Sequence, residues 1–320
     1  MHRSHKHTEG ILNRSQERLW IVVAAGLALG MIVVAHANQS APADPAGVTA
    51  PGAQVELLAE GFEFTEGPTP DAQGNVYFTD QPNDRICKWS VDGKLTDFLK
   101  PAGRSNGMLM DPNGVLWTCA DMDNQLWRID PNGTVTVVVK DYAGKLLNGP
   151  NDLWMAPDGG IYFTDPLFAR NYWTRSRQMQ QDGQHVYYLS ADRKSLTRVI
   201  EDLRQPNGII GTPDGKTLYV ADMGGRRTYR YTINPDHTLS DKTPFCSMGS
   251  DGMTIDAEGN VYLTGRGVTV FNPAGEQIQQ IQIAEGWTAN VCFGGADRKT
   301  LFITASDSLY AVKMRVKGAY

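Results

Sequence analysis

A short unit recurs six times in this sequence, and it constrains the fold more than any other feature. It is clearest over 147–166, LNGPNDLWMAPDGGIYFTDP, which reads as a polar residue, a short apolar strand, a Pro-Asp-Gly turn and a second strand. The turn requires glycine for its positive φ, and the aromatic and β-branched residues after it suit a half-buried pleated surface. Each copy is therefore predicted to form a β-hairpin.

The spacing of the copies is typical of a β-propeller. The copies begin at Glu66, Asn106, Asn151, Asn207, Asp251 and Asn290, so successive copies start 40, 45, 56, 44 and 39 residues apart. That is the length of a four-stranded blade, and further strand-like segments, such as 85–89, 125–129 and 186–189, lie between the copies. Six such units close into a ring with few exposed edges. We therefore predict an all-β, six-bladed β-propeller with four-stranded blades over residues 53–318.

The first 37 residues read as a separate export segment. Four basic residues precede an apolar run at 19–35, and Ala35-His36-Ala37 fits a small-x-small cleavage site. We predict a signal peptide for Sec-type export over residues 1–37 and a periplasmic location. The apolar run approaches the length that spans a bilayer, so an uncleaved membrane anchor is the alternative. Residues 38–52, rich in Ala and Pro, are interpreted as a linker.

The composition narrows the possible functions. A net charge of -5 and a pI near 5.7 argue against nucleic-acid binding, which requires a basic stripe. The four cysteines would permit disulfides in an exported protein. Each of them lies in or beside a predicted strand among apolar neighbours, and none forms a Cys-x-x-Cys motif. We favour the interpretation that they are small buried hydrophobic residues.

Each copy of the unit places one polar side chain just before its first strand. If that strand lines the central channel, the six side chains converge at one end of the axis. Two are carboxylates, Glu66 and Asp251, and four are amides. Carboxylates withdrawn from water are costly unless a cation compensates them, and oxygen ligands without His or Cys select hard ions such as Ca²⁺, Mg²⁺ or Mn²⁺. A divalent ion would leave this site neutral with open positions, which is typical of a catalytic metal.

Other catalytic arrangements have little support. The pattern Gly-x-Ser-x-Gly occurs once, at residues 103–107, but a nucleophile elbow leads from a strand into a helix, and no helix is predicted after it. Four of the six histidines lie in the leader. His185 and His237 fall in outer or loop segments, so a Ser-His-Asp or His-dyad hydrolase is not favoured. The long third interval contains a polar segment near 169–184, which is either a plain surface insertion or a lid over the site.

Several motifs occur in the order found in one known family. They are Glu66-Gly-Pro, Gly149-Pro-Asn-Asp152, Pro206-Asn-Gly208, Ser250-Asp-Gly-Met253 and Asn290-Val-Cys-Phe-Gly-Gly295. Together these motifs resemble the senescence-marker/gluconolactonase (regucalcin-like) family, and its bacterial gluconolactonase branch in particular. The resemblance covers all six predicted blades, from about 60 to 312. It implies a six-bladed propeller that hydrolyses lactones with one divalent ion in the channel.

The resemblance also implies roles for individual residues. In some members of the family the residue at the Asn151 position contacts substrate rather than metal. A related family of fluorophosphatases adds a histidine in the last blade, where this chain has Trp287 and Thr288, which weakens a phosphotriesterase interpretation. Carried over, the metal ligands would be Glu66, Asn151, Asn207 and Asp251, and the substrate-binding residues would be Arg104, Asn106 and Asn290.

We therefore predict a gluconolactonase-type carboxylic ester hydrolase that opens glucono-1,5-lactone, or a close aldonolactone, to the sugar acid. Ca²⁺ is the expected cofactor, with Mg²⁺, Mn²⁺ or Zn²⁺ as alternatives. The metal would polarise the lactone carbonyl, while Asp251, as ligand and base, would accept the proton of the attacking water. Two alternatives stay open: promiscuous hydrolysis of phosphotriesters or lipophilic lactones, and a non-catalytic calcium-stabilised propeller that binds glycans or proteins. The membrane would be a partner only if the leader is uncleaved, and the sequence leaves the oligomeric state open.

Overall fold

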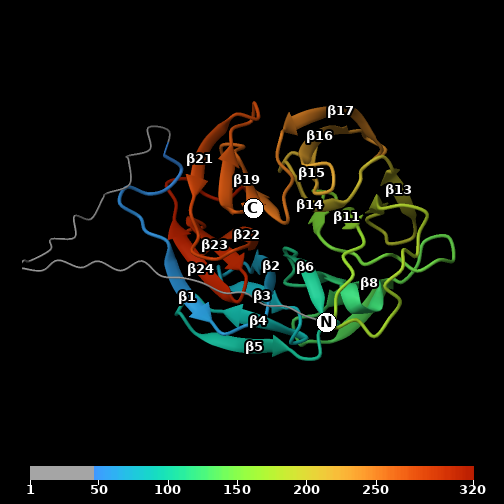
Figure 1. Ribbon diagram of the computed structural model, residues 1–320, viewed down its shortest axis with the longest axis horizontal. Coiled ribbons are helices and arrows are strands. Elements are labelled where there is room, and N and C mark those ends of the chain that lie inside the picture. The colour runs from blue at the N-terminus through green and yellow to red at the C-terminus, as the bar shows by residue number, and fades with distance from the viewer. Residues whose placement is uncertain (1–46) are drawn as a thin grey trace, which may run out of the picture. The chain divides into compact units, whose positions relative to one another are not determined.

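The computed structural model describes residues 47–320, which build a ring of six antiparallel sheets around a central channel (Figure 1). Each sheet has four strands, so the predicted six-bladed propeller is confirmed. The predicted signal peptide and most of the predicted linker lie outside the described residues. Over the described range, the helical structure is limited to one 3₁₀ turn, η1 (Asp121–Asp123), and nothing helical is long or apolar enough to cross a membrane.

Five blades are continuous in sequence and run from an innermost strand at the channel to an outermost strand at the rim (Figure 1). Blade 1 contains β2 (Thr65–Pro70), β3 (Val76–Asp80), β4 (Arg85–Trp89) and β5 (Leu95–Leu99). Blade 2 contains β6 (Ser105–Met110), β7 (Leu116–Ala120), β8 (Gln125–Ile129) and β9 (Val135–Val139). Blade 3 contains β10 (Leu153–Met155), β11 (Ile161–Asp165), β12 (His185–Leu189) and β13 (Leu196–Ile200). Blade 4 contains β14 (Pro206–Gly211), β15 (Thr217–Asp222), β16 (Arg227–Ile233) and β17 (Leu239–Cys246). Blade 5 contains β18 (Met253–Ile255), β19 (Val261–Gly265), β20 (Gly267–Phe271) and β21 (Gln277–Ile281).

The sixth blade is built from both ends of the propeller. Its inner strands are β22 (Thr288–Gly294), β23 (Thr300–Ala305) and β24 (Ser308–Lys313), and its outermost strand is β1 (Glu56–Glu60). The pairing of β1 with β24 is antiparallel and joins Glu56 to Ala311. This pairing closes the ring and leaves no inner sheet edge exposed.

In blades 1, 2 and 5 the hairpin of the repeat is stabilised by an aspartate that opens its turn. In blade 1 the Asp71 Oδ1 atom accepts hydrogen bonds from the backbone N–H groups of Gln73 and Asn75, at 3.0 and 2.9 Å. Asp111 and Asp256 do the same two and four residues later in their own turns. These are Asx-type turns, in which the side chain satisfies backbone donors that the bend leaves unpaired. The recurring aspartates of the turns are therefore structural.

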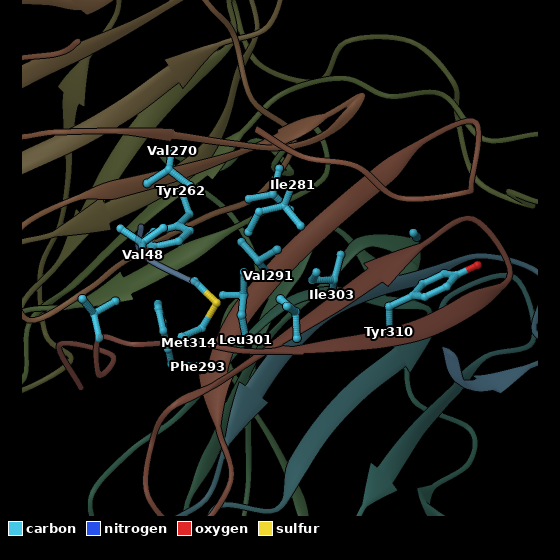
Figure 2. Packing of buried hydrophobic residues seen from close by; sticks show 14 residues of the cluster. Val48, Tyr262, Val270, Ile281, Val291, Phe293, Leu301, Ile303, Tyr310 and Met314 are labelled. Atoms are coloured by element: carbon cyan, nitrogen blue, oxygen red, sulfur yellow. The ribbon is translucent and has the colours of Figure 1, made fainter. Parts of the chain in front are cut away.

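Buried side chains between neighbouring blades form the core. One cluster fills the space between blades 5 and 6 and includes Tyr262, Phe293 and Leu301 (Figure 2). Val48, which is 1% exposed, also packs in this cluster, so part of the segment interpreted as a linker belongs to the core. The four cysteines are buried and free, as their apolar surroundings predicted: Cys87, Cys119, Cys246 and Cys292.

Candidate active site

The polar residues that begin the six repeats lie where the innermost strands enter the channel. The sequence predicted that they precede these strands, but four of them lie inside, as the second or third residue. Four inner strands, those of blades 1, 2, 4 and 6, shift register next to them; in blade 1 the shift falls between Glu66 and Thr69. A β-bulge of this kind re-aims a side chain away from the regular alternation. The four residues inside strands are Glu66 in β2, Asn106 in β6, Asn207 in β14 and Asn290 in β22, and the two that precede their strands are Asn151 and Asp251.

Glu66 and Asp251 are each held by hydrogen-bond donors from other parts of the channel. Glu66 is 2% exposed, and its Oε2 atom accepts from the Gly67 backbone N–H at 2.8 Å and from Asn290 Nδ2 at 3.2 Å. The Asp251 Oδ1 atom accepts from Asn207 Nδ2 at 2.8 Å, and its Oδ2 atom accepts from Trp287 Nε1 at 2.6 Å. Both carboxylates are thereby fixed in orientation at the channel end.

Burial and mutual repulsion make both carboxylates difficult to ionise. Burial raises the pKa of Glu66 well above its ordinary value, and the negative charges of Asp251 and Asp152 raise it further. Burial also raises the pKa of Asp251, although its bonds to Trp287 and Asn207 oppose the rise. Like charges close together in a poorly solvated channel favour the protonated form unless a cation is present. The chemistry of this cluster therefore favours a positive partner.

Asn207 provides the sharpest test of whether a cation fits. Its amide nitrogen donates to Asp251, while its Oδ1 atom is buried and has no hydrogen-bond partner within residues 47–320. A buried acceptor without a donor is costly, and an amide oxygen is a ligand that hard divalent ions accept. Over the same residues, no three His, Cys, Asp or Glu side chains gather as a metal-binding group. A cation here would have to combine the two carboxylates with amide oxygens, and Asn207 offers one.

A third carboxylate near the axis was missed in the sequence. Asp152 is 7% exposed, burial raises its pKa to about 8, and the charge of Asp251 contributes to that rise. Its Oδ1 atom accepts from the Leu153 backbone N–H at 2.9 Å. It follows Asn151 directly in the repeat, and only its position beside the channel distinguishes it from a turn residue.

The remaining predicted residues lie at the same end of the channel. The Asn151 backbone carbonyl accepts from the Gly107 N–H at 2.7 Å, which joins blades 2 and 3 at the axis. Asn106 is 2% exposed in the strand next to Glu66. The Arg104 side chain donates to the Pro82 carbonyl, and its guanidinium carbon lies 4.5 Å from the centre of the Tyr172 ring. Arg104 is therefore covered by the loop that carries Tyr172.

That loop is the long third interval, residues 166–184 between β11 and β12. It crosses from blade 3 toward blade 2, and Trp173, which is 5% exposed, donates from Nε1 to Asp121 Oδ2 at 3.1 Å. Arg170 lies beside the same carboxylate, and its positive charge lowers the pKa of Asp251 against the larger effect of burial. The loop thus reaches the neighbourhood of the carboxylate cluster, which favours the lid over the plain surface insertion.

Two other features lie apart from this cluster. His185 pairs with Asp182 and His237 pairs with Asp158, each at 3.1 Å, so both histidines have structural partners. A cavity of ≈ 830 Å³ occupies the channel, and its lining includes Asp152 and Asn290 but none of the four predicted metal ligands. The cavity is also lined by Tyr320, whose hydroxyl bonds to Trp154 and Gly211. The cavity therefore lies beyond Glu66 and Asp251, toward the opposite mouth.

Close packing of the inner strands predicts a strong effect of adding one methyl group at Gly67. This residue has φ +48°, and a Cβ atom would lie 2.1 Å from the Asn106 carbonyl oxygen of the next blade. Gly52 also has positive φ (+73°) but would meet nothing within 4 Å. We expect Gly52→Ala to cost about 1–2 kcal/mol of unfolding free energy through the backbone conformation alone.

Gly67→Ala should cost at least about 2 kcal/mol more than this control, because inner strands must separate to admit the new atom. Urea denaturation of both variants measures the two costs. Equal destabilisation of the two variants would show that the inner strands are not packed as tightly as described.

Comparison with known proteins finds a matching family model, related sequences and similar solved structures. The family model described as SMP-30/Gluconolactonase/LRE-like region matches residues 55–307. A gluconolactonase of Zymomonas mobilis is 30% identical over 293 residues, covering 82% of each chain. The solved structure of a gluconolactonase from Xanthomonas campestris superimposes with a TM-score of 0.78 at 30% identity, covering 83% of this chain and 91% of that one.

A more distant solved structure shares the fold. It is a calcium-binding protein, regucalcin, from Agrobacterium tumefaciens, with a TM-score of 0.69 at 21% identity over 82% of this chain and 94% of that one. At this identity the likeness concerns the architecture of six blades and the channel they enclose.

Proposed function

This chain belongs to the SMP-30/gluconolactonase/LRE-like family and is a lactone-hydrolysing enzyme, and we propose that it opens a sugar lactone with the help of a divalent cation. The proposed substrate is glucono-1,5-lactone or a close aldonolactone, and the proposed ion is Ca²⁺. The relatives named as gluconolactonases support the substrate class. The calcium-binding protein of the same fold supports the choice of ion.

The observation that carries the metal proposal is the unsatisfied oxygen of Asn207, whose nitrogen donates to the buried Asp251. The charge of Asp251 in turn raises the pKa of the buried Glu66. In this proposal Glu66, Asn207 and Asp251 hold the ion, with Asn151 as the fourth ligand at the same channel end. Oxygen-only ligands favour Ca²⁺ or Mg²⁺ over ions that prefer His and Cys. When bound, the divalent ion supplies charge compensation for the carboxylates and polarisation of the lactone carbonyl.

The chain's own residues carry the proton transfer. Water adds to the lactone carbonyl carbon, the ring C–O bond breaks, and the ring oxygen takes up a proton to give the open-chain hydroxy acid. Asp251 is proposed to accept the proton that the attacking water loses. Its two hydrogen-bond donors, Asn207 and Trp287, orient the carboxylate for this role. Arg104, Asn106 and Asn290 are proposed to bind the substrate.

The proposal is tested by acid release in a pH-stat with purified protein and glucono-1,5-lactone. We expect turnover above the spontaneous background in Ca²⁺, loss of at least about 90% of it in excess chelator, and recovery when Ca²⁺ is restored, because two uncompensated carboxylates cannot serve the reaction. Turnover that a chelator leaves unchanged would overturn the metal dependence. No turnover of any aldonolactone would overturn the substrate assignment and leave lipophilic lactones or phosphotriesters to be assayed next.

A further inference from the structure

The loop at residues 166–184 is fixed to the neighbouring blade through one buried carboxylate, Asp121. In addition to the bond from Trp173, Asp121 Oδ1 accepts from Arg175 Nη2 at 3.1 Å. The same arginine donates to the Asp121 carbonyl at 2.8 Å, and Gln81 Nε2 donates to Asp121 Oδ2 at 3.2 Å. The Arg175 guanidinium carbon lies 3.4 Å from the centre of the Trp173 ring. These contacts make the loop an ordered cover rather than a free surface insertion.

The position of Asp121 departs from the pattern of blades 1, 3 and 4. At the end of the second strand, Asp80, Asp165 and Asp222 accept hydrogen bonds from backbone N–H groups just before their own innermost strands. In blade 2 that position is Ala120, which pairs with Ser105, and the carboxylate comes one residue later. The shift directs the Asp121 side chain to the loop. Blade 2 therefore lacks the hydrogen bond from this aspartate position to the backbone before its own innermost strand. Its Asp121 instead holds the loop at residues 166–184 of blade 3.

The anchored loop presents two polar groups that no protein atom satisfies. The Tyr172 hydroxyl and the Arg170 Nε–H are both buried, and neither has a hydrogen-bond partner within residues 47–320. The Tyr172 ring is held from one side by Arg104. Arg170 Nε lies 4.0 Å from Asp121 Oδ2, which is too far for a hydrogen bond. The loop thus holds two donors in place without using them.

Both groups lie close to the carboxylate cluster. Burial raises the pKa of Tyr172, so its hydroxyl keeps its proton at neutral pH, and the charges of Arg170, Arg104 and Glu66 all act on that pKa. The charge of Arg170 likewise acts on the pKa of Asp251. The two unused donors thus belong to the segment of the loop that covers Arg104, at the channel end where the residues proposed to bind substrate lie.

We propose that the Tyr172 hydroxyl and the Arg170 Nε–H donate hydrogen bonds to hydroxyl groups of the bound lactone, and that the loop thereby selects polyhydroxylated lactones. The inference rests on the proposed function, because it assigns a substrate-binding role at that site. A buried donor without an acceptor is unfavourable, and a hydroxyl group of the substrate would remove this cost. A lactone without hydroxyl groups would leave the donors unpaired, and sites built in this way discriminate strongly against such analogues.

The test compares two six-membered lactones in the Ca²⁺-loaded enzyme. Glucono-1,5-lactone carries ring hydroxyls, and δ-valerolactone has the same ring and carbonyl without them. Tyr172→Phe keeps the ring that Arg104 contacts and removes only the hydroxyl. We expect it to lower kcat/KM for gluconolactone about tenfold, with most of the loss in KM, and to change that for δ-valerolactone less than about twofold. Arg170→Lys keeps the charge and removes the Nε donor. It should likewise lower kcat/KM for gluconolactone much more than kcat/KM for δ-valerolactone.

Tyr231→Phe is the matched control. The Tyr231 hydroxyl is also buried without a hydrogen-bond partner in the described part of the chain, but it lies in the core between blades 3 and 4. Its removal should leave the ratio of the two kcat/KM values unchanged. Equal losses for both lactones in Tyr172→Phe would show that the loop is only structural and would overturn the inference.

A binding measurement separates this inference from the proposed function. Calorimetric titration with 1,5-anhydro-D-glucitol, which keeps the ring hydroxyls and lacks the carbonyl, should give an affinity that Tyr172→Phe weakens about tenfold. If the wild type binds this polyol through Tyr172 but hydrolyses no lactone, the proposed function is wrong and the inferred contact stands. If the wild type hydrolyses gluconolactone and Tyr172→Phe binds the polyol equally well, only the inference is wrong. Absence of both binding and hydrolysis would overturn both.

Discussion

Asp251→Asn is expected to lower the turnover of glucono-1,5-lactone by roughly 10²–10⁴-fold, even at saturating Ca²⁺, which is the contribution of a positioned general base. The amide keeps the size of the side chain and one carbonyl oxygen. It cannot accept the proton of an attacking water, and it removes one of the two charges that a cation would balance. Calcium affinity, measured by calorimetry, should therefore fall as well, and saturating Ca²⁺ should restore occupancy without restoring turnover.

Two comparisons make this result decisive. Asp241→Asn changes the net charge by the same amount at an exposed position and should leave turnover unchanged. Spontaneous hydrolysis of gluconolactone has to be subtracted in every case. If Asp251 only holds the ion, saturating Ca²⁺ should restore full turnover, and the base would have to be sought at Glu66 or in a water at the metal.

Glu66→Gln is expected to change the thermal stability in opposite directions with and without Ca²⁺. The pKa of Glu66 is raised in the folded protein, so the folded state holds its proton more tightly than the unfolded state. In chelator, the wild type should therefore lose stability as the pH rises above about 4.5, because ionising this buried carboxylate costs free energy only in the folded state. Gln keeps an oxygen for the Gly67 and Asn290 donors and cannot ionise. The variant should therefore lose less stability than the wild type as the pH rises in chelator.

At pH 8 in chelator we expect the Glu66→Gln melting temperature to exceed that of the wild type by a few degrees, and the gap to close toward pH 4.5. In saturating Ca²⁺ the order should reverse, because the ion stabilises the ionised wild-type site more than a site with one carboxylate. Calcium affinity should fall by about tenfold or more with the lost charge. The exposed Glu56→Gln serves as the control. Identical melting curves for variant and wild type in both conditions would contradict a role for Glu66 in holding a cation.

The repeated hairpin could be predicted from sequence because its determinants are local. An aspartate and a glycine define each turn, and alternating apolar residues define the strands, so the six blades follow from the six copies. The polar residue that opens each copy was identified for the same reason. The hydrogen-bond partners of these polar residues were not predictable. The bonds from Trp287 and Asn207 to Asp251, for example, join three blades, and no local pattern encodes them.

The features missed in the sequence depend on distant neighbours. Tyr172 and Arg170 belong to a polar loop with no repeat, and they gain meaning only because Asp121 of another blade holds that loop over the channel. Val48 reads as part of an Ala- and Pro-rich linker, yet it packs against strands of blades 5 and 6. In each case the structural role comes from tertiary packing, which overrides local composition.

The pairing of β1 with β24, which closes the ring, joins the first and last strands of the propeller and therefore constrains the order of folding. We call this junction the seam. Glu66 lies on the first side of the seam and Asn290, which donates to it, lies on the last, 224 positions later. At ~5–20 residues per second, a ribosome needs roughly 10–45 s to make the intervening chain. During that interval β1 lacks its partner strand β24, and Glu66 lacks the hydrogen bond from Asn290. Contacts this distant in sequence form slowly, so we expect the ring to close late in folding, and the contact between Glu66 and Asn290 to form together with that closure.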